Sequence, residues 1–215
     1  MGFLSSLLNE VMSPGRPVFA VVDTETTGFS AKRDRIIELG VVLIDSNFRE
    51  CERWSTLINP QKKITNSHIH GITDDMVANA PTFSQVFGEF ANKLHGLHLM
   101  AHNADFDMKM IGGEIERFDD YDEDSDEVLT LPFIDTIHLA KQLTSGPYKL
   151  ESLAKKCHVF NPNAHAAVDD AATTAAVMRK LGASKLSLAI KDQGVPFDAS
   201  IVRTWDLESR TTVSR

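Results

Sequence analysis

The apolar residues of this chain form short continuous runs near its start and helical stripes farther along. Three runs, at residues 18–23, 36–45 and 51–58, have the length and the β-branched content of strands. The first is apolar almost throughout, which is typical of a central strand covered on both faces. Because only the turn-like segment SNFR separates the second run from the third, we expect these two strands to pair antiparallel.

Beyond residue 74 the pattern alternates between helix and strand. An apolar stripe at helical spacing predicts the first long helix, with Phe83, Val86, Phe87, Phe90 and Leu94. The runs at 97–103 and 131–135 predict two more strands. Further helices are predicted from about 106, over 136–143, from 148, and over 166–181. Three neighbouring strands followed by this alternation predict an α/β domain, with a five-stranded mixed sheet flanked by helices.

The two ends of the chain differ from this central pattern. Residues 1–17 carry apolar side chains at roughly helical spacing up to the break SPGRP. This predicts a short amphipathic extension that packs on the body rather than on a partner. Residues 182–215 form a polar C-terminal extension, so we predict one domain over residues 18–181.

The net charge of −8 depends on one acidic run at residues 119–127. The run holds seven acids and no basic residue, which leaves 23 of the 30 acids against 22 Lys and Arg elsewhere. We interpret it as a solvated loop, since it lacks the glycine and terminal glutamate of a calcium loop. The near-neutral remainder predicts weak, distributive nucleic-acid binding, but it is compatible with an acidic site that metal ions neutralise.

Other features of the composition concern the compartment. No apolar stretch approaches the roughly 20 residues that span a membrane, so no membrane partner is expected. The first basic residue is Arg16, so the chain lacks the basic start of a signal peptide. Cys51 and Cys157 make no disulfide framework. We therefore expect a reducing, cytoplasmic location.

Pairs of carboxylates follow two of the predicted strands. Asp23 and Glu25 lie two residues apart, so an extended backbone directs both to one face of the sheet. They come at the strand end where α/β sheets usually form their sites. Asp105 and Asp107 follow the run at 97–103 and begin a helix, which either of them could cap. Taken alone, the first pair is more typical of a cap and turn.

A third group combines a histidine with a carboxylate. His165 and Asp170 are five residues apart, which would separate them by about 140° on one helix. They can share a site only if His165 lies in the loop before the helix and Asp170 lies one turn inside it. The segment NPN at residues 161–163 favours such a loop. A histidine in this position would by itself more often be a surface or capping residue.

Together these groups supply four carboxylates and one histidine at strand ends and helix starts. Four acids in one cleft repel one another unless cations bind. Oxygen ligands suit Mg²⁺ or Mn²⁺ better than zinc. Two such ions, ~3.5–4 Å apart, assist the in-line attack of water on a phosphodiester, with the histidine removing a proton. The residues therefore predict two-metal phosphodiester hydrolysis.

At this point the chain resembles a known family, the DEDDh class of DnaQ-like 3′–5′ exonucleases, which includes bacterial proofreading subunits. The matching motifs occur in order as DTETTG, IHGITDDMV, AHNADFD, IDTIHLAKQL, YKLESLAK and HAAVDDA. The resemblance covers residues 18–181, which it identifies as an exonuclease domain. It implies a ribonuclease H-like three-layer fold.

The resemblance also implies roles for individual residues. The third acid of the family directly follows the phenylalanine of H-N-x-x-F-D, which selects Asp107 over Asp105. The implied metal ligands are Asp23, Glu25, Asp107 and Asp170, which act in catalysis together with His165 as the general base. The implied substrate-binding residues are Thr26, Thr27, Gly28, Phe29, His70, His102 and Asn103. Phe29 would stack on or wedge beside a base, whereas each of the last three could equally be a structural hydrogen-bonding group.

The expected function is metal-dependent 3′–5′ hydrolysis of single-stranded DNA to nucleoside 5′-monophosphates, in proofreading or repair. The same chemistry on RNA is an alternative, because no residue indicates contacts to a 2′-hydroxyl. A non-catalytic nucleic-acid or polymerase-binding module is another, although the complete set of acids argues against it. A DNA polymerase or sliding clamp is a candidate partner, since QGVPF at residues 193–197 is faintly similar to a bacterial clamp-binding peptide without its leucine.

Overall fold

The structure is a computed structural model that describes residues 15–118 and 133–186. A five-stranded sheet lies at its centre, in the order β3-β2-β1-β4-β5. The strands are β1 Phe19–Thr26, β2 Ile36–Ile44, β3 Glu50–Leu57, β4 His98–Ala101 and β5 Phe133–Asp135. Pairing is antiparallel between β1 and β2 and between β2 and β3, and parallel between β1 and β4 and between β4 and β5. The predicted mixed sheet is confirmed.

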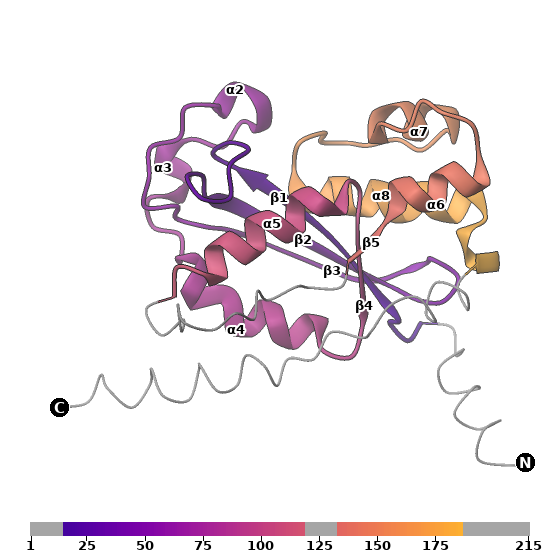
Figure 1. The fold of residues 1–215 in the computed structure, drawn as a ribbon, viewed down its shortest axis with the longest axis horizontal. Helices are drawn as coiled ribbons and strands as arrows, with labels where there is room; N and C mark the ends of the chain where they lie inside the picture. Colours follow the sequence, from indigo (N-terminus) through magenta and orange to yellow (C-terminus); the bar gives the residue numbers. More distant parts are fainter. Residues whose placement is uncertain (1–14, 119–132, 187–215) are drawn as a thin grey trace, which may run out of the picture.

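Helices cover both faces of the sheet (Figure 1). They are α2 Ser67–His70, α3 Asp74–Val77, α4 Phe83–Leu94, α5 Ala104–Ile115, α6 Thr136–Leu143, α7 Leu150–Lys156 and α8 Ala167–Leu181, followed by the 3₁₀ helix η1 Ala183–Leu186. Helices α4 and α5 pack on one face, and α6, α7 and α8 pack on the other. The α/β architecture with flanking helices is therefore as predicted.

The side chains of β1 alternate between these two layers. Ala20 and Val22 are in the core beneath α4 and α5, whereas Phe19 and Val21 are in the core beneath α6, α7 and α8. Because side chains of a strand alternate with period two, Asp23 and Glu25 continue the series of Phe19 and Val21. Both acids therefore lie on the α8 side of the sheet.

Strand β1 continues through its acids, whereas we predicted that it would end at residue 23. Asp23 pairs with Gly40 and Glu25 with Glu38 in the antiparallel ladder to β2. On its other edge β1 loses its partner at Val21, where the pairing with β4 stops. The predicted strand at 97–103 is thus only four residues long, and its helix begins at Ala104 rather than near 106. One edge of β1 is open beside its acids.

Helix α8 reaches this open end because a glycine and a glutamate of β2 hold its N-terminus. A Cβ atom at Gly40 would lie 2.3 Å from the backbone of Ala167, so only glycine allows α8 to pack this closely. The Glu38 carboxylate accepts a hydrogen bond from the Ala167 N–H at 3.1 Å. The preceding residue, Ala166, has no side chain that could cap the helix. Asp170 is therefore carried to the sheet by contacts with β2.

Several predictions concern residues outside the described ranges. Most of the N-terminal extension at 1–17, the acidic run at 119–127 and the segment at 193–197 belong to this group. The division into 1–17, 18–181 and 182–215 stays a prediction. Across the residues described, no helix is both long and apolar enough to cross a bilayer.

Candidate active site

The predicted acids converge at the open end of β1. The ligand atoms of Glu25, His165 and Asp170 all lie within 4.8 Å of one another. Burial raises the pKa of Asp23 well above its usual value, and the charges of Asp107, Asp170 and Glu25 raise it further. The four carboxylates are thus close enough to repel one another.

The same causes act on the other acids. Burial raises the pKa of Glu25 to about 8, helped by the charges of Asp170, Glu38 and Asp107. Burial raises the pKa of Asp107 to about 7, although a hydrogen bond from Thr24 opposes the shift. These oxygen-rich groups, with one imidazole, could hold divalent metal ions, whose charge would offset the repulsion.

The two acids of α5 have different surroundings. Asp107 is buried and accepts a hydrogen bond from Thr24 Oγ1 at 2.8 Å. The Asp105 side chain is 76% exposed and lies 3.5 Å from Lys109. Neither caps the helix, because the N-cap residue is Asn103, in a left-handed conformation without a side-chain cap bond. Burial therefore distinguishes Asp107 from Asp105 as the resemblance does.

His165 lies in the loop before α8, as its pairing with Asp170 required. The loop covers residues 157–166, and His165 is exposed there with a left-handed φ of 68°. Asp170 accepts two hydrogen bonds from the loop, from Asn161 Nδ2 at 2.5 Å and from the His165 N–H at 3.1 Å. Asn163 donates to the neighbouring Asp169 at 2.9 Å, and Asp169 lies 3.4 Å from Arg53.

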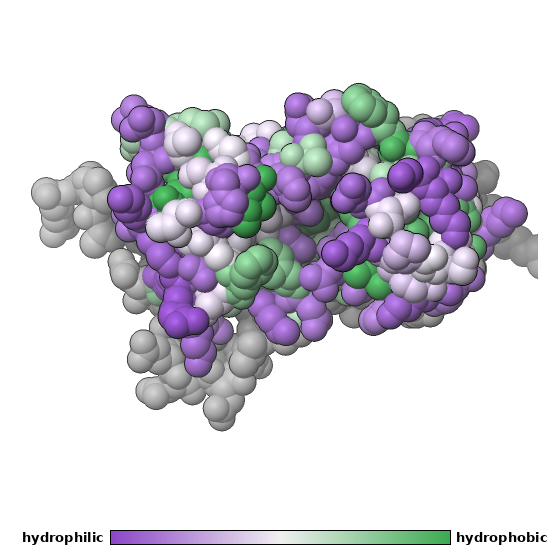
Figure 2. Space-filling view, turned by 90° about the horizontal axis from the view of Figure 1, so that it is seen from above, coloured by the Kyte–Doolittle hydropathy of each residue, from purple (hydrophilic) through white to green (hydrophobic). Residues whose placement is uncertain are grey.

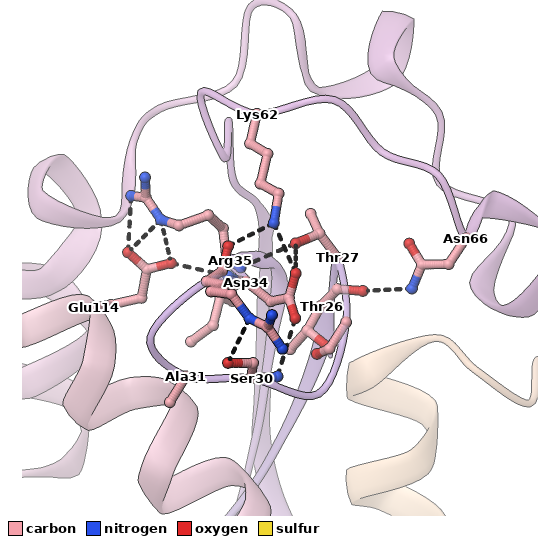
Figure 3. A network of polar contacts seen from close by, with 12 residues as sticks. Thr26, Thr27, Ser30, Ala31, Asp34, Arg35, Lys62, Asn66 and Glu114 are labelled. Carbon is pink, nitrogen blue, oxygen red and sulfur yellow. Dashed lines mark hydrogen bonds and ion pairs between the residues drawn. The ribbon is translucent and has the colours of Figure 1, made fainter.

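The residues after β1 form a loop that is closed by its own polar groups (Figure 3). The Asp34 carboxylate accepts hydrogen bonds from the Ser30 N–H at 3.0 Å and from Thr27 Oγ1 at 3.3 Å, and it pairs with Lys62 at 2.7 Å. A Cβ atom at Gly28 would lie 2.5 Å from Asp34, so the glycine is required for this closure.

Two further contacts concern the predicted nucleotide edge. Thr26 Oγ1 donates to the Gly28 carbonyl at 2.7 Å. The Phe29 ring is 85% exposed, with its centroid 6.1 Å from that of Phe106 on α5. The threonine hydroxyls therefore shape the loop, and the loop presents the Phe29 ring to the solvent.

The loop is also joined to α5 by an ion pair. Arg35 donates to both carboxylate oxygens of Glu114, at 2.9–3.0 Å, and the Ile36 N–H donates to the same carboxylate at 2.9 Å. The Glu114 side chain is only 1% exposed. This bidentate arrangement fixes the end of the loop against the helix that carries Asp107.

The remaining predicted substrate residues have different surroundings. His102 has partners at both ring nitrogens, Thr136 Oγ1 at 3.0 Å and the Tyr148 carbonyl at 2.8 Å. Asn103 is exposed at the start of α5. His70 Nδ1 accepts from the Ile72 N–H at 3.1 Å, so its proton lies on Nε2, a buried atom without a partner in the described ranges.

His70 also lies close to the candidate general base. Burial lowers its pKa, and the charges of His165 and His68 lower it further. His70 is therefore a neutral hydrogen-bond donor beside the site.

The surface of the molecule above the strand ends is hollowed between its left part, with α2 and α3, and its right part, with α6 and α7 (Figure 2).

The residue-by-residue reasoning missed two contributors to this site. Glu38 is a fifth carboxylate, paired with Glu25 across the ladder, and burial raises its pKa. Asn161 was interpreted only as part of a loop, although its amide holds Asp170. A polar residue inside the apolar run at 36–45 was the available signal for Glu38, whereas the Asn161 contact had no signal in the local pattern.

Comparison with known proteins identifies relatives of this domain. A family model described as exonuclease matches residues 20–178. The chain is 36% identical over 159 residues to the DNA polymerase III subunit epsilon of Treponema pallidum, a match covering 71% of each protein. It is 36% identical over 183 residues to the PolC-type DNA polymerase III of Thermotoga maritima, but the match spans 13% of that much longer protein.

Solved structures show the same fold. Exonuclease X in complex with 5′ overhanging duplex DNA matches with 26% identity and a TM-score of 0.60, over 76% of this chain and 90% of that one. Escherichia coli exonuclease I in complex with a dT13 oligonucleotide matches with 19% identity and a TM-score of 0.65, over 81% of this chain and 43% of that one. The sheet and its helices thus have the ribonuclease H-like fold of exonucleases.

Proposed function

The chain belongs to this exonuclease family of DnaQ-like nucleases, and we propose that it hydrolyses single-stranded DNA from the 3′ end to nucleoside 5′-monophosphates. The observation that carries the proposal is the convergence of four carboxylates and an exposed histidine at the open end of β1. The polymerase III names of the relatives favour a role in proofreading or repair, together with a DNA polymerase.

In this proposal the metal ligands are Asp23, Glu25, Asp107 and Asp170. Their buried, mutually repelling carboxylates fit Mg²⁺ or Mn²⁺, because such ions prefer oxygen ligands and would offset the charge. Two bound ions would supply Lewis acidity at the scissile phosphate. The carboxylates themselves contribute position, since strands and helices of the core hold each of them.

His165 is the proposed general base. Its imidazole is exposed on a loop, and its backbone N–H donates to Asp170, so the ring stays beside the acids. A ring nitrogen of this imidazole would accept the proton of the attacking water. The neutral His70 Nε2–H would donate a hydrogen bond to a phosphate or sugar oxygen of the substrate.

The terminal nucleotide would lie along Thr26, Thr27 and Gly28, with Phe29 against a base. The closed loop supports this role, because it presents an exposed aromatic ring beside Phe106, the residue before Asp107. Asn103 would contact the substrate from the exposed start of α5. Since both nitrogens of His102 have protein partners, we propose that His102 shapes the site by holding the backbone at Tyr148.

A degradation assay tests this function directly. Matched DNA and RNA oligomers labelled at the 5′ end are incubated with Mg²⁺, Mn²⁺ or EDTA, and the labelled products are separated by length. We expect the DNA to shorten stepwise from its 3′ end with either metal and to stay intact in EDTA. Intact DNA under all conditions, or shortening of RNA alone, would contradict the proposal.

A further inference from the structure

Two phenylalanines stand out among the exposed side chains of the described residues. Four large hydrophobic residues are exposed there, namely Phe29, Ile69, Met76 and Phe160. Phe29 and Phe160 are the most exposed, each at 85%. Phe29 belongs to the proposed nucleotide edge, whereas Phe160 has no role so far. A single exposed apolar residue is common on protein surfaces, so its place in the fold must decide what it does.

The residues on either side of Phe160 are turned into the protein. Val159 packs against the core beneath α6, α7 and α8, and its N–H donates to the Ala154 carbonyl at 2.9 Å. On the other side Asn161 donates to Asp170 at 2.5 Å. With both neighbours anchored, the backbone of Phe160 is held in place, and its exposed ring belongs to the residue next to the one that contacts Asp170.

Phe160 and Phe29 belong to loops that are anchored to different layers of the fold. Phe29 lies beside Phe106 of α5, which packs in the layer with α4. Phe160 belongs to the loop that joins α7 to α8, and these two helices pack in the other layer (Figure 1). Residues 157–166 contain no acidic residue, and the exposed Lys155 precedes them. A polyanionic strand can therefore approach this loop more readily than the acid cluster itself.

We propose that Phe160 is a second stacking platform, which binds an unpaired base of the nucleic acid one or more nucleotides before the terminal one. This inference rests on the proposed function, and it adds a base-binding position on the side of the site that carries His165. Aromatic rings bind bases of any sequence through their faces, so the contact would select for unpaired ends rather than for a sequence.

The test compares Phe160→Ala and Phe160→Trp with the control Met76→Ala, which removes another exposed apolar side chain. Binding of a fluorescent oligothymidine is followed by anisotropy in EDTA, and KM and kcat are then measured with Mg²⁺. We expect Phe160→Ala to weaken binding and raise KM by about 5- to 150-fold, the range for one stacked base. Phe160→Trp should keep the affinity and KM close to those of the wild type, because its side chain can still stack on a base. The control Met76→Ala should match the wild type.

A substrate series locates the contacted base. One abasic nucleotide is moved stepwise from the 3′ end, and one position should weaken binding to the wild type but not to Phe160→Ala. Equal behaviour of Phe160→Ala and Met76→Ala would overturn the inference while the proposed function stands. A wild type that neither binds nor shortens the oligomer would overturn both. If Phe160→Ala bound DNA normally but no longer bound a DNA polymerase subunit, the ring would be assigned to a protein contact, and the inference would also be overturned.

Discussion

The two loops that border the acid cluster are held in place by different kinds of contact. The loop at residues 27–35 is closed by Asp34 and Lys62, and Arg35 joins it to the buried Glu114 (Figure 3). None of these groups belongs to the proposed metal ligands. This side of the site is therefore built independently of the proposed metal centre.

The loop at residues 157–166 depends on the acid cluster itself. Its contacts with α8 include the bonds from Asn161 and His165 to Asp170, which is a proposed metal ligand. His165 adopts a left-handed conformation there, which a residue with a side chain holds only when its surroundings support it. In the proposed function, the loop at residues 27–35 is thus a fixed edge for the terminal nucleotide. The loop that carries the proposed general base has a position that is coupled to the proposed metal site.

The largest effect should follow from removing Asp170, the group that joins the second loop to the metal site. Asp170→Ala and Asp23→Ala should each lower kcat by about 10³-fold or more, because each removes a proposed metal ligand worth several kcal/mol. Only Asp170→Ala should also speed hydrogen exchange at residues 161–166. Equal exchange in the two variants, measured by mass spectrometry, would show that the loop does not depend on Asp170.

Removing His165 tests whether this residue acts as a general base or as a metal ligand. His165→Ala should lower kcat by about 10²–10⁴-fold, the usual contribution of a general base. Because His165 lies within ligand distance of Glu25 and Asp170, its effect on metal binding decides between the two roles. We expect Mn²⁺ affinity, measured by calorimetry, to fall far less than in Asp170→Ala. An equal fall would identify His165 as a metal ligand.

Much of the fold was predictable because hydrophobic periodicity is local. The strands at residues 36–45 and 51–58 and the helices at 136–143 and 166–181 agree with β2, β3, α6 and α8 to within one residue at each end. The end of β1 was not predictable, because polar residues after an apolar run are typical of a strand end. The strand continues there only because β2 pairs with it through Glu25 and Glu38.

The candidate site was likewise predictable only in part. The spacing of Asp23 and Glu25 sufficed to predict that they share a face, and the resemblance selected Asp107 over Asp105. The hydrogen bond from Asn161 to Asp170 and the support of α8 by Glu38 depend on chain segments brought together by folding. A pattern read along the chain contains no information on such contacts.

A change in the contacts of the loop at residues 27–35 should lower the stability of the protein rather than kcat. Glu114→Ala leaves Arg35 without its partner and the Ile36 N–H without an acceptor, so we expect the free energy of unfolding to fall by about 3–5 kcal/mol. Denaturant titration measures this change. The control is Glu50→Ala, which breaks an exposed pair with Arg53 and should cost only about 0.2–1 kcal/mol. Similar losses in both variants would mean that the buried pair does not hold the loop.

A change in the contacts of the loop at residues 157–166 should instead lower kcat. Asn161→Ala removes a hydrogen bond to a carboxylate, worth about 1.5–3 kcal/mol, and we expect it to lower kcat by about 10- to 100-fold. Asn163→Ala is the matched control, since Asn163 binds Asp169 rather than Asp170. An Asn163→Ala variant as impaired as Asn161→Ala would assign the effect to the loop as a whole.

The smallest effect concerns pH and the protein without metal. The pKa of Glu25 is raised from its usual 4.5 to about 8, and that of Asp107 from 3.8 to about 7. Between about pH 4 and 8 the folded protein therefore binds more protons than the unfolded chain, so stability falls as the pH rises. In EDTA the midpoint of thermal unfolding should therefore fall across this window, and each 1 kcal/mol of lost stability should shift it by about 2–4 °C.

Metal ions should change the sign of this dependence. Bound Mn²⁺ would keep the carboxylates ionised, so its stabilising effect should grow as the pH rises. The control Glu25→Gln removes one titrating group and should make the slope in EDTA shallower. A midpoint in EDTA that rises between pH 4 and 8 would mean that these carboxylates are not held together in the folded protein. The loop at residues 27–35 would then border no acid cluster, and its proposed role in binding the terminal nucleotide would lose its basis.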